Sequence, residues 1–367
     1  MAAVEGVEVT RAEIVGSLLQ PEHLLEVREA VAAGTTTEAE LHAVEDEAVL
    51  AAIALQESVG VDVITDGEQR RPSWADTSRH LHGFEPRGGE RSYPANPRMA
   101  TPSTAAPVVV APISPRAEHP LAKEYPFLRA HATSRTKYTM AAPSYHRRYW
   151  SDEHSTSGYD TVEEFLTDVR DWQAGVARRL VEQGCDYIQL DAPNYGSLCD
   201  PATRAFHEAR GHRVDEQVAF DAALDSSLFE GLGNITRALH ICRGNMPGGT
   251  WHSSGGYAVI ADQVFPNLDV DVVLLEYDTD RAGDFAPIAK VKPGTVVVLG
   301  LLTTKSGALE DEGLVEARLR EAAKLRELDE LALSTQCGFA SAENAPMTPA
   351  EQRAKLELVA RVAHRVW

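Results

Sequence analysis

The chain has 367 residues, a formal net charge of −20, 43% hydrophobic residues and 25% charged residues. This composition is typical of a folded globular protein, and the negative charge argues against nucleic acid and anionic membranes as partners. No apolar run reaches the length of a membrane span, and the first residues lack the pattern of a secretory signal. Four cysteines are too few for a disulfide scaffold at this length, so we expect a reducing, cytoplasmic location.

Short apolar runs alternate with longer amphipathic segments, and each run is short enough for a buried parallel strand. The predicted strands are EIVGS around Ile14, VDVITD around Val63, KYTMAA around Thr139, DYIQLD around Ile188, RALHIC around Leu239, DVVLLE around Leu274, TVVVLG around Val297 and ELALST around Leu333. The clearest helical patterns are at residues 41–59, 161–184, 214–232 and 350–367. Strands that alternate with helices in this way predict an α/β fold, a single (β/α)8 TIM barrel that spans residues 1–367.

Residues from about 80 to 135 interrupt this alternation after the second predicted strand. The segment is rich in proline, glycine and arginine, and it contains one strand-like run, PVVVAPI. We therefore expect an insertion that covers the mouth of the barrel.

Candidate site residues, most of them polar or reactive, recur where the predicted strands end. They are Ser17, Glu68, Pro143, Asp191, Cys242, Glu276 and Cys337. Active sites of (β/α)8 barrels lie at the carboxyl ends of the strands. The sequence therefore predicts that these side chains meet at one site.

A zinc site is predicted within this group. His240 and Cys242 are separated by one residue, and residues i and i+2 of a strand point to the same face. Glu276 ends the next strand and Cys337 follows the last one, so a closed barrel brings both near the same ion. One imidazole, two thiolates and one carboxylate suit tetrahedral Zn²⁺ better than Mg²⁺ or Ca²⁺.

Each of these residues also has a structural interpretation. A buried cysteine is often just a small hydrophobic side chain, and Glu276 could pair with Arg243 or Arg281. The zinc interpretation depends on the four residues lying at the same end of the barrel. We expect Cys185 to pack between a helix and a strand, and Cys199 to lie in a loop without a role.

Four segments resemble the cobalamin-independent methionine synthase family, in particular its short, single-barrel, methionine synthase II-like branch. They are HICRGN, LLEYDTDRAGDF, VVLGLLTTKSGALED and STQCGFAS. The likeness extends from Gly16 to the final helix and is strongest from Asp186 onward. It implies zinc ligands in the order His, Cys, Glu and Cys, which are the four residues above. It also implies that zinc holds homocysteine as a thiolate, which takes a methyl group to give methionine.

The resemblance further implies a pocket for the amino-acid part of the thiol. Glu68 and Asp191 would hold its ammonium group, and Ser17 would hold its carboxylate. The structural alternatives are an ion pair of Glu68 with Arg70 or Arg71, a loop cap for Asp191 and a turn hydroxyl for Ser17.

The donor side departs from the full-length synthases. Their amino-terminal barrel has no counterpart, Ala192 follows Asp191 where they carry an acid, and the region of their catalytic histidine reads LLTTKSG. The methyl donor is therefore open between a folate, a methylated corrinoid protein and another small molecule. Tyr195, His146 and Lys305 are the candidates for donor contact or proton transfer.

Three other functions fit parts of the pattern. An epoxyalkane:coenzyme M transferase would use the same zinc site, but its sulfonated thiol needs cations where Glu68 and Asp191 are expected. The arginines at 70–71 and 147–148 could supply them. A metal-free lyase of the uroporphyrinogen decarboxylase type would have no use for paired cysteines. A protein that only stores zinc would have no open coordination position.

Overall fold

A six-stranded parallel sheet with the order β12-β11-β10-β7-β6-β5 forms the centre of the molecule. The computed structural model describes residues 9–75, 80–87, 107–116, 121–340 and 346–367. The strands of the sheet are β5 (Tyr138–Ala141), β6 (Tyr187–Asp191), β7 (Thr236–Ile241), β10 (Val272–Glu276), β11 (Val296–Leu302) and β12 (Leu331–Thr335). β1 (Val63–Ile64) pairs in parallel with β4 (Arg135–Thr136), which leads directly into β5. The predicted α/β fold with a parallel sheet is confirmed.

The first predicted strand, around Ile14, is the exception. Its segment makes one isolated bridge, between Ala12 and Leu333 of β12, and forms no ladder. The carboxylate of Asp62 accepts hydrogen bonds from the backbone amides of Arg11 and Ala12, at 2.6 and 2.9 Å. A side chain therefore takes up backbone donors that a neighbouring strand would otherwise use.

The four long helical predictions are confirmed as α2 (Glu38–Val59), α4 (Val162–Glu182), α7 (Val214–Ser227) and α10 (Pro349–Val366). Their ends follow from local chemistry. The side chain of Thr37 accepts a hydrogen bond from the amide of Glu40, and α2 stops at Gly60, whose φ is 82°. Thr348 and Glu351 form a capping box at the start of α10. None of the helices that the structure describes is long and apolar enough to cross a membrane.

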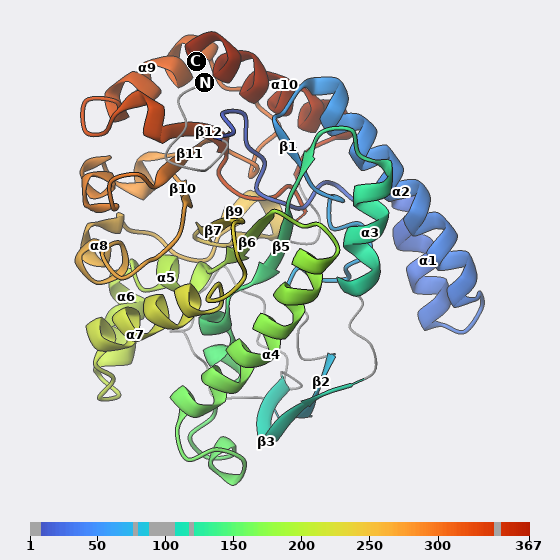
Figure 1. Cartoon of the computed structure of the whole chain (residues 1–367), viewed down its shortest axis with the longest axis vertical. Helices are drawn as coiled ribbons and strands as arrows, with labels where there is room; N and C mark the ends of the chain where they lie inside the picture. The colour runs from blue at the N-terminus through green and yellow to red at the C-terminus, as the bar shows by residue number, and fades with distance from the viewer. Residues whose placement is uncertain (1–8, 76–79, 88–106, 117–120, 341–345) are drawn as a thin grey trace.

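Shorter elements complete the described part of the chain. The helices are α1 (Glu22–Ala32), α3 (Leu121–His131), α5 (Pro193–Ser197), α6 (Pro201–Glu208), α8 (Ala261–Val264) and α9 (Glu312–Ala322), and the remaining strands are β2 (Leu81–Pro86), β3 (Pro107–Pro115), β8 (Asn245–Met246) and β9 (Thr250–Trp251). Figure 1 shows the helices arranged around the central strands.

Both faces of the central sheet are buried, and alternate residues of a strand serve the two faces. In β10, Val272 and Leu274 pack in a small cluster with Val298 of β11. Val273 and Leu275 belong instead to the large core that contains residues of α4, α7 and α10. This two-sided burial explains why the strands read as continuous apolar runs in the sequence.

The predicted insertion contains a β2–β3 antiparallel pair and α3. Val109 of β3 packs against Phe165 and Leu166 of α4, and Figure 1 places the hairpin beyond α4, away from the central strands. Residues 88–106 and 117–120 lie outside the described residues. Coverage of the barrel mouth by this segment therefore stays a prediction.

Candidate active site

Three of the four predicted metal ligands converge at the carboxyl end of the central sheet. One ligand atom each from His240, Cys242 and Cys337 lies within 4.8 Å of the others, and all three residues are buried. His240 belongs to β7 and Cys242 follows it, so the strand's period of two aims both side chains the same way. Cys337 arrives from the loop after β12, across the sheet from β7.

The chemistry of this cluster fits a zinc ion. Nδ1 of His240 lies 3.3 Å from the carbonyl oxygen of Leu274, while Nε2 is buried without a hydrogen-bond partner. The contact with Cys337, together with burial, raises the pKa of Cys242 well above its ordinary value. A divalent cation reverses this effect, because it stabilises thiolates directly. Two sulfur atoms and one imidazole nitrogen form a donor set that zinc prefers.

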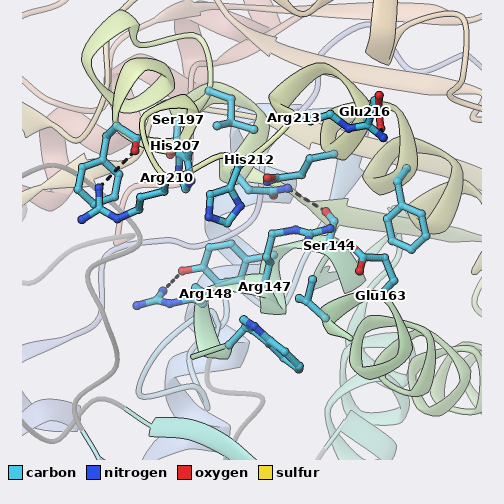
Figure 2. Close-up of a pocket in the computed structure, with 18 of the residues that line it drawn as sticks. Ser144, Arg147, Arg148, Glu163, Ser197, His207, Arg210, His212, Arg213 and Glu216 are labelled. Atoms are coloured by element: carbon cyan, nitrogen blue, oxygen red, sulfur yellow. Dashed lines mark hydrogen bonds and ion pairs between the residues drawn. The ribbon is translucent and has the colours of Figure 1, made fainter. Parts of the chain in front are cut away.

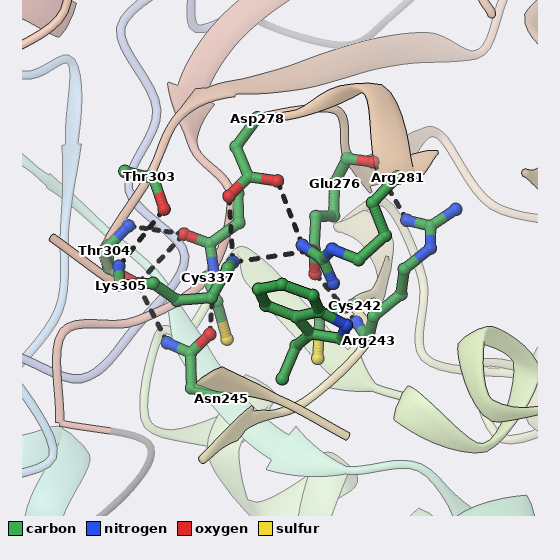
Figure 3. A network of polar contacts seen from close by, with 12 residues as sticks. Cys242, Arg243, Asn245, Glu276, Asp278, Arg281, Thr303, Thr304, Lys305 and Cys337 are labelled. Carbon is green, nitrogen blue, oxygen red and sulfur yellow. Dashed lines mark hydrogen bonds and ion pairs between the residues drawn. The ribbon is translucent and has the colours of Figure 1, made fainter. Parts of the chain in front are cut away.

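Glu276, the fourth predicted ligand, lies next to this cluster but is not part of it. One oxygen of its carboxylate accepts a hydrogen bond from the amide of Arg243 at 2.8 Å. The other oxygen pairs with the guanidinium of Arg281 and lies 3.4 Å from Nζ of Lys305. Figure 3 shows this network beside the sulfur atoms of Cys242 and Cys337. The structural alternative for Glu276, a pair with Arg281, is thus present in the structure.

The predicted substrate residues share a cavity with the cluster. The cavity has a volume of about 240 Å³, and we call it the cysteine cavity. Its walls include Ser17, Glu68, Asp191, His240, Cys242 and Cys337. Residues that are far apart in sequence are therefore brought to one concave site, as their positions after the strands predict.

Glu68 is held in an unusual local conformation. Its φ is 57°, in the left-handed region that disfavours side chains other than glycine, so the turn carries backbone strain. Its carboxylate accepts a hydrogen bond from Oγ1 of Thr139 at 2.6 Å and lies 3.5 Å from Arg71. Burial raises the pKa of Glu68. A cationic ligand in the cavity would stabilise the charged form of this carboxylate.

Asp191 and Ser17 are fixed by their neighbours. Nε2 of Gln189 donates a hydrogen bond to Asp191 at 2.7 Å, and the same nitrogen donates to the carbonyl of Val15. Burial raises the pKa of Asp191 to about 7, so this carboxylate also favours a cationic partner. Oγ of Ser17 accepts a hydrogen bond from the amide of Ala340 at 3.2 Å.

The three donor-side candidates do not line the cysteine cavity. The hydroxyl of Tyr195 donates a hydrogen bond to Asp225 at 2.5 Å. His146 is fully buried, and burial lowers its pKa to about 4. Lys305 makes an ion pair with Asp278 at 2.9 Å. Tyr195 and Lys305 are thus committed to other contacts within the fold, and the lowered pKa of His146 leaves its ring neutral near pH 7.

Sequence reasoning missed several residues of this cavity, among them Trp74, Tyr145 and His252. Trp74 comes shortly after the strained turn at Glu68, and His252 follows β9. Tyr145 lies in a short 3-10 helix, Pro143–Tyr149, directly after β5, whereas Trp74 and His252 belong to loops that no spacing rule links to the strand ends. The position of Tyr145 just after β5, and of the other two in loops after β1 and β7, is the signal that could have pointed to them.

A larger cavity of about 570 Å³, here called the arginine cavity, adjoins the first one. The two cavities share three residues, Tyr145, Arg148 and Ser197. Figure 2 shows Arg148 and Arg210 toward one side of the arginine cavity, and Glu163 and Glu216 toward the other. Aromatic side chains of Trp150, Phe206 and Phe220 also contribute to its walls.

Gly196 of α5 allows the backbone after β7 to come close. A Cβ atom at this position would lie 1.9 Å from the carbonyl oxygen of Cys242. We therefore expect Gly196→Ala to displace the Cys242 segment, to lower the free energy of unfolding by about 1–3 kcal/mol and to weaken metal retention. Gly175→Ala in α4 is the matched control, because nothing lies within 4 Å of its added Cβ. Denaturant unfolding and metal analysis of both variants check this expectation. Equal stability and equal metal content in the two variants would contradict it.

Comparisons with known proteins place the chain among its relatives. Residues 10–364 match the family described as cobalamin-independent synthase, catalytic domain. The chain belongs to this family. The uncharacterized protein YxjH of Bacillus subtilis (strain 168) is 34% identical over 363 residues, which cover 97% of this chain and 94% of that protein.

Two further relatives carry functional names. The methionine synthase of Sulfurisphaera tokodaii is 28% identical over 233 residues, which cover 63% of this chain and 61% of that protein. A presumed vitamin-B12 independent methionine synthase from Listeria monocytogenes is 27% identical and covers 98% of this chain and 99% of that one, with a TM-score of 0.76. Membership in the cobalamin-independent synthase family implies a methyltransferase, and at the level of the family the reaction is methyl transfer to homocysteine.

Proposed function

We propose that this protein is a zinc-dependent methyltransferase that alkylates the sulfur of homocysteine, or of a close analogue, to give methionine. One observation carries the proposal: His240, Cys242 and Cys337 share a single cavity with the carboxylates of Glu68 and Asp191. A metal-binding triad beside two anions suits a thiol that also carries an ammonium group.

The proposed ligands are His240, Cys242 and Cys337, with Glu276 as the fourth. If zinc binds there, it would lower the pKa of a bound thiol, whose proton would pass to solvent, and the sulfur would be available as a thiolate at neutral pH. The sulfur forms a bond to the methyl carbon while the donor's bond to that carbon breaks, and the donor leaves with the electron pair. The protein's contribution is to exclude water and to aim the thiol at the cluster.

The substrate pocket is proposed from the same contacts. Glu68 and Asp191 would bind the ammonium group, since both are buried carboxylates whose pKa values burial raises. Thr139 and Gln189 hold these carboxylates in position through hydrogen bonds of 2.6 and 2.7 Å. Ser17 would bind the substrate carboxylate.

The donor is proposed to approach through the arginine cavity, because its wall is continuous with the cysteine cavity at Tyr145 and Arg148. A folate and a methylated corrinoid protein remain the two donor classes of the proposal. A volume of about 570 Å³ is enough for a small-molecule donor or for part of a corrinoid.

An epoxyalkane:coenzyme M transferase is the second candidate. Arg148 lines the cysteine cavity, and an arginine there could bind a sulfonate. Glu68 and Asp191 line the same cavity and would repel that group, so the homocysteine proposal is favoured. Family membership favours it too.

A comparison of two thiols tests the proposal. We expect Asp191→Asn to weaken homocysteine binding by roughly 1.5–3 kcal/mol, because a desolvated, charge-assisted contact with the ammonium is lost. The binding of mercaptoethanesulfonate, which has no ammonium group, should be weakened little by the same substitution. Asp186→Asn is the control, since the side chain of Asp186 is 58% exposed and pairs with Arg135. Equal losses for the two thiols would refute the proposed pocket.

The proposal includes a closed eight-stranded barrel and a cytoplasmic location. Closure is supported by backbone hydrogen bonds from Leu333 to Arg11, from Asp62 to Ala12 and from Lys137 to Ile64. They would link β12, the first segment, β1 and the β4–β5 segment in a ring. None of the four cysteines, all of which the structure describes, forms a disulfide, which fits a reducing compartment.

A further inference from the structure

Glu276 belongs to a buried group of four charged side chains behind the metal-binding triad. The other members are Asp278, Arg281 and Lys305, and the side chains of all four are at most 7% exposed. Arg281 pairs with both carboxylates, and it lies 3.2 Å from Asp278. Lys305 likewise contacts both, at 3.4 Å from Glu276 and 2.9 Å from Asp278. Figure 3 shows the two cations between the two carboxylates.

These four side chains carry two positive and two negative charges, and the buried guanidinium of Arg243, which donates to the backbone carbonyl of Glu276, adds a third cation close by. An unpaired buried charge is costly, so neither cation could easily lose both of its anionic partners. Asp278 contacts both Arg281 and Lys305, and it would still pair with them if Glu276 turned away. Glu276 can therefore exchange the cations for a metal ion without leaving a buried cation alone.

The loop that carries Lys305 is tied to the loop that carries Cys337. Thr304, the residue before Lys305, accepts a hydrogen bond from Asn245 and donates one to the carbonyl of Gly338. The amide of Thr304 also donates to Gln336 at 2.6 Å. Lys305 is thereby held at a fixed position relative to one of the metal-binding sulfur atoms.

We propose that Lys305 and Asp278 set the strength of the Glu276 contact with the metal, and that they do so in opposite directions. Lys305 competes with the metal for the carboxylate of Glu276. Asp278 competes with Glu276 for the two cations, and this competition frees the carboxylate of Glu276 to contact the metal. Lys305 is then a positioning residue that acts through Glu276. This inference rests on the proposed metal site of His240, Cys242 and Cys337.

Zinc affinity of the metal-free protein, measured by competition with a chromophoric chelator, tests the proposal. We expect Lys305→Met to tighten zinc binding by about 10-fold, because a cation that holds Glu276 is removed. We expect Asp278→Asn to weaken it by about 10-fold, because the cations then depend on Glu276 alone. A purely structural role would change both affinities in the same direction. Lys305→Arg retains the cation and should bind zinc like the wild type.

Two further measurements complete the test. In a Glu276→Gln background the effects of both substitutions should disappear, and the absorption bands of bound Co²⁺ should report the change of ligand independently. Lys137→Met is the control, because Lys137 is a fully buried lysine paired with Glu13 elsewhere in the fold. It should leave zinc affinity unchanged even if it lowers stability. If the wild type binds zinc, and the two substitutions change zinc affinity in the same direction or not at all, the inference is overturned but the proposed function is not. If the wild type binds no zinc, the proposed function itself is overturned.

Discussion

Cys337→Ser is expected to lose most of its zinc and essentially all methyl transfer. The wild type should carry about one zinc ion per chain, as the donor set of two sulfur atoms and one imidazole implies. Serine offers a hydroxyl of much higher pKa, so one thiolate ligand is removed without a change of shape. Since the proposed nucleophile forms only through the metal, activity should fall on the order of 10³-fold.

Elemental analysis of the purified variant checks the first part, and methionine formation from homocysteine checks the second. Cys185→Ser is the matched control. Its thiol is buried, donates to the carbonyl of Tyr187 and packs in the large core, so the substitution should cost stability but no zinc. Full zinc retention in Cys337→Ser would remove Cys337 from the site.

The convergence of His240, Cys242 and Cys337 was predictable because it follows from strand geometry. His240 and Cys242 share a face through the period of two, and the carboxyl ends of parallel strands meet on one side of a sheet. The same argument brought Glu68 and Asp191 to the cysteine cavity. These predictions need only the identity of the strands, which continuous apolar runs reveal well.

The hydrogen bonds and ion pairs of individual side chains could not be predicted in the same way. Tyr195 donates to Asp225, thirty positions away, and Glu276 at the end of β10 pairs with Lys305 from the loop after β11. Each contact depends on rotamers and on loop paths that no periodicity encodes. The segment around Ile14 makes one isolated bridge to β12 rather than a ladder, and next to that bridge the carboxylate of Asp62 accepts hydrogen bonds from the amides of Arg11 and Ala12.

Free methyltetrahydrofolate is expected to be a poor methyl donor, at least about 10²-fold slower than free methylcobalamin, because its departing nitrogen needs a proton. The three candidate acids are badly placed to donate this proton. Tyr195 is bound to Asp225 outside the cysteine cavity, burial lowers the pKa of His146 to about 4, and Lys305 is held in ion pairs. Positioned proton transfer typically contributes roughly 10²–10⁴-fold, whereas a corrinoid leaving group requires no proton.

Initial rates of methionine formation with the two donors, at equal homocysteine and zinc, measure this difference. Folate turnover on the order of 1 s⁻¹ or faster, a rate typical of enzymes, would contradict the expectation. The acid would then have to be a residue that lines the cavity, and His252 is the first to test. Burial lowers the pKa of His252, so the neutral ring would have to take up a proton from solvent before it could donate one. Folate turnover through His252 should therefore decline as the pH rises and should be lost in His252→Ala, while the rate with methylcobalamin stays unchanged.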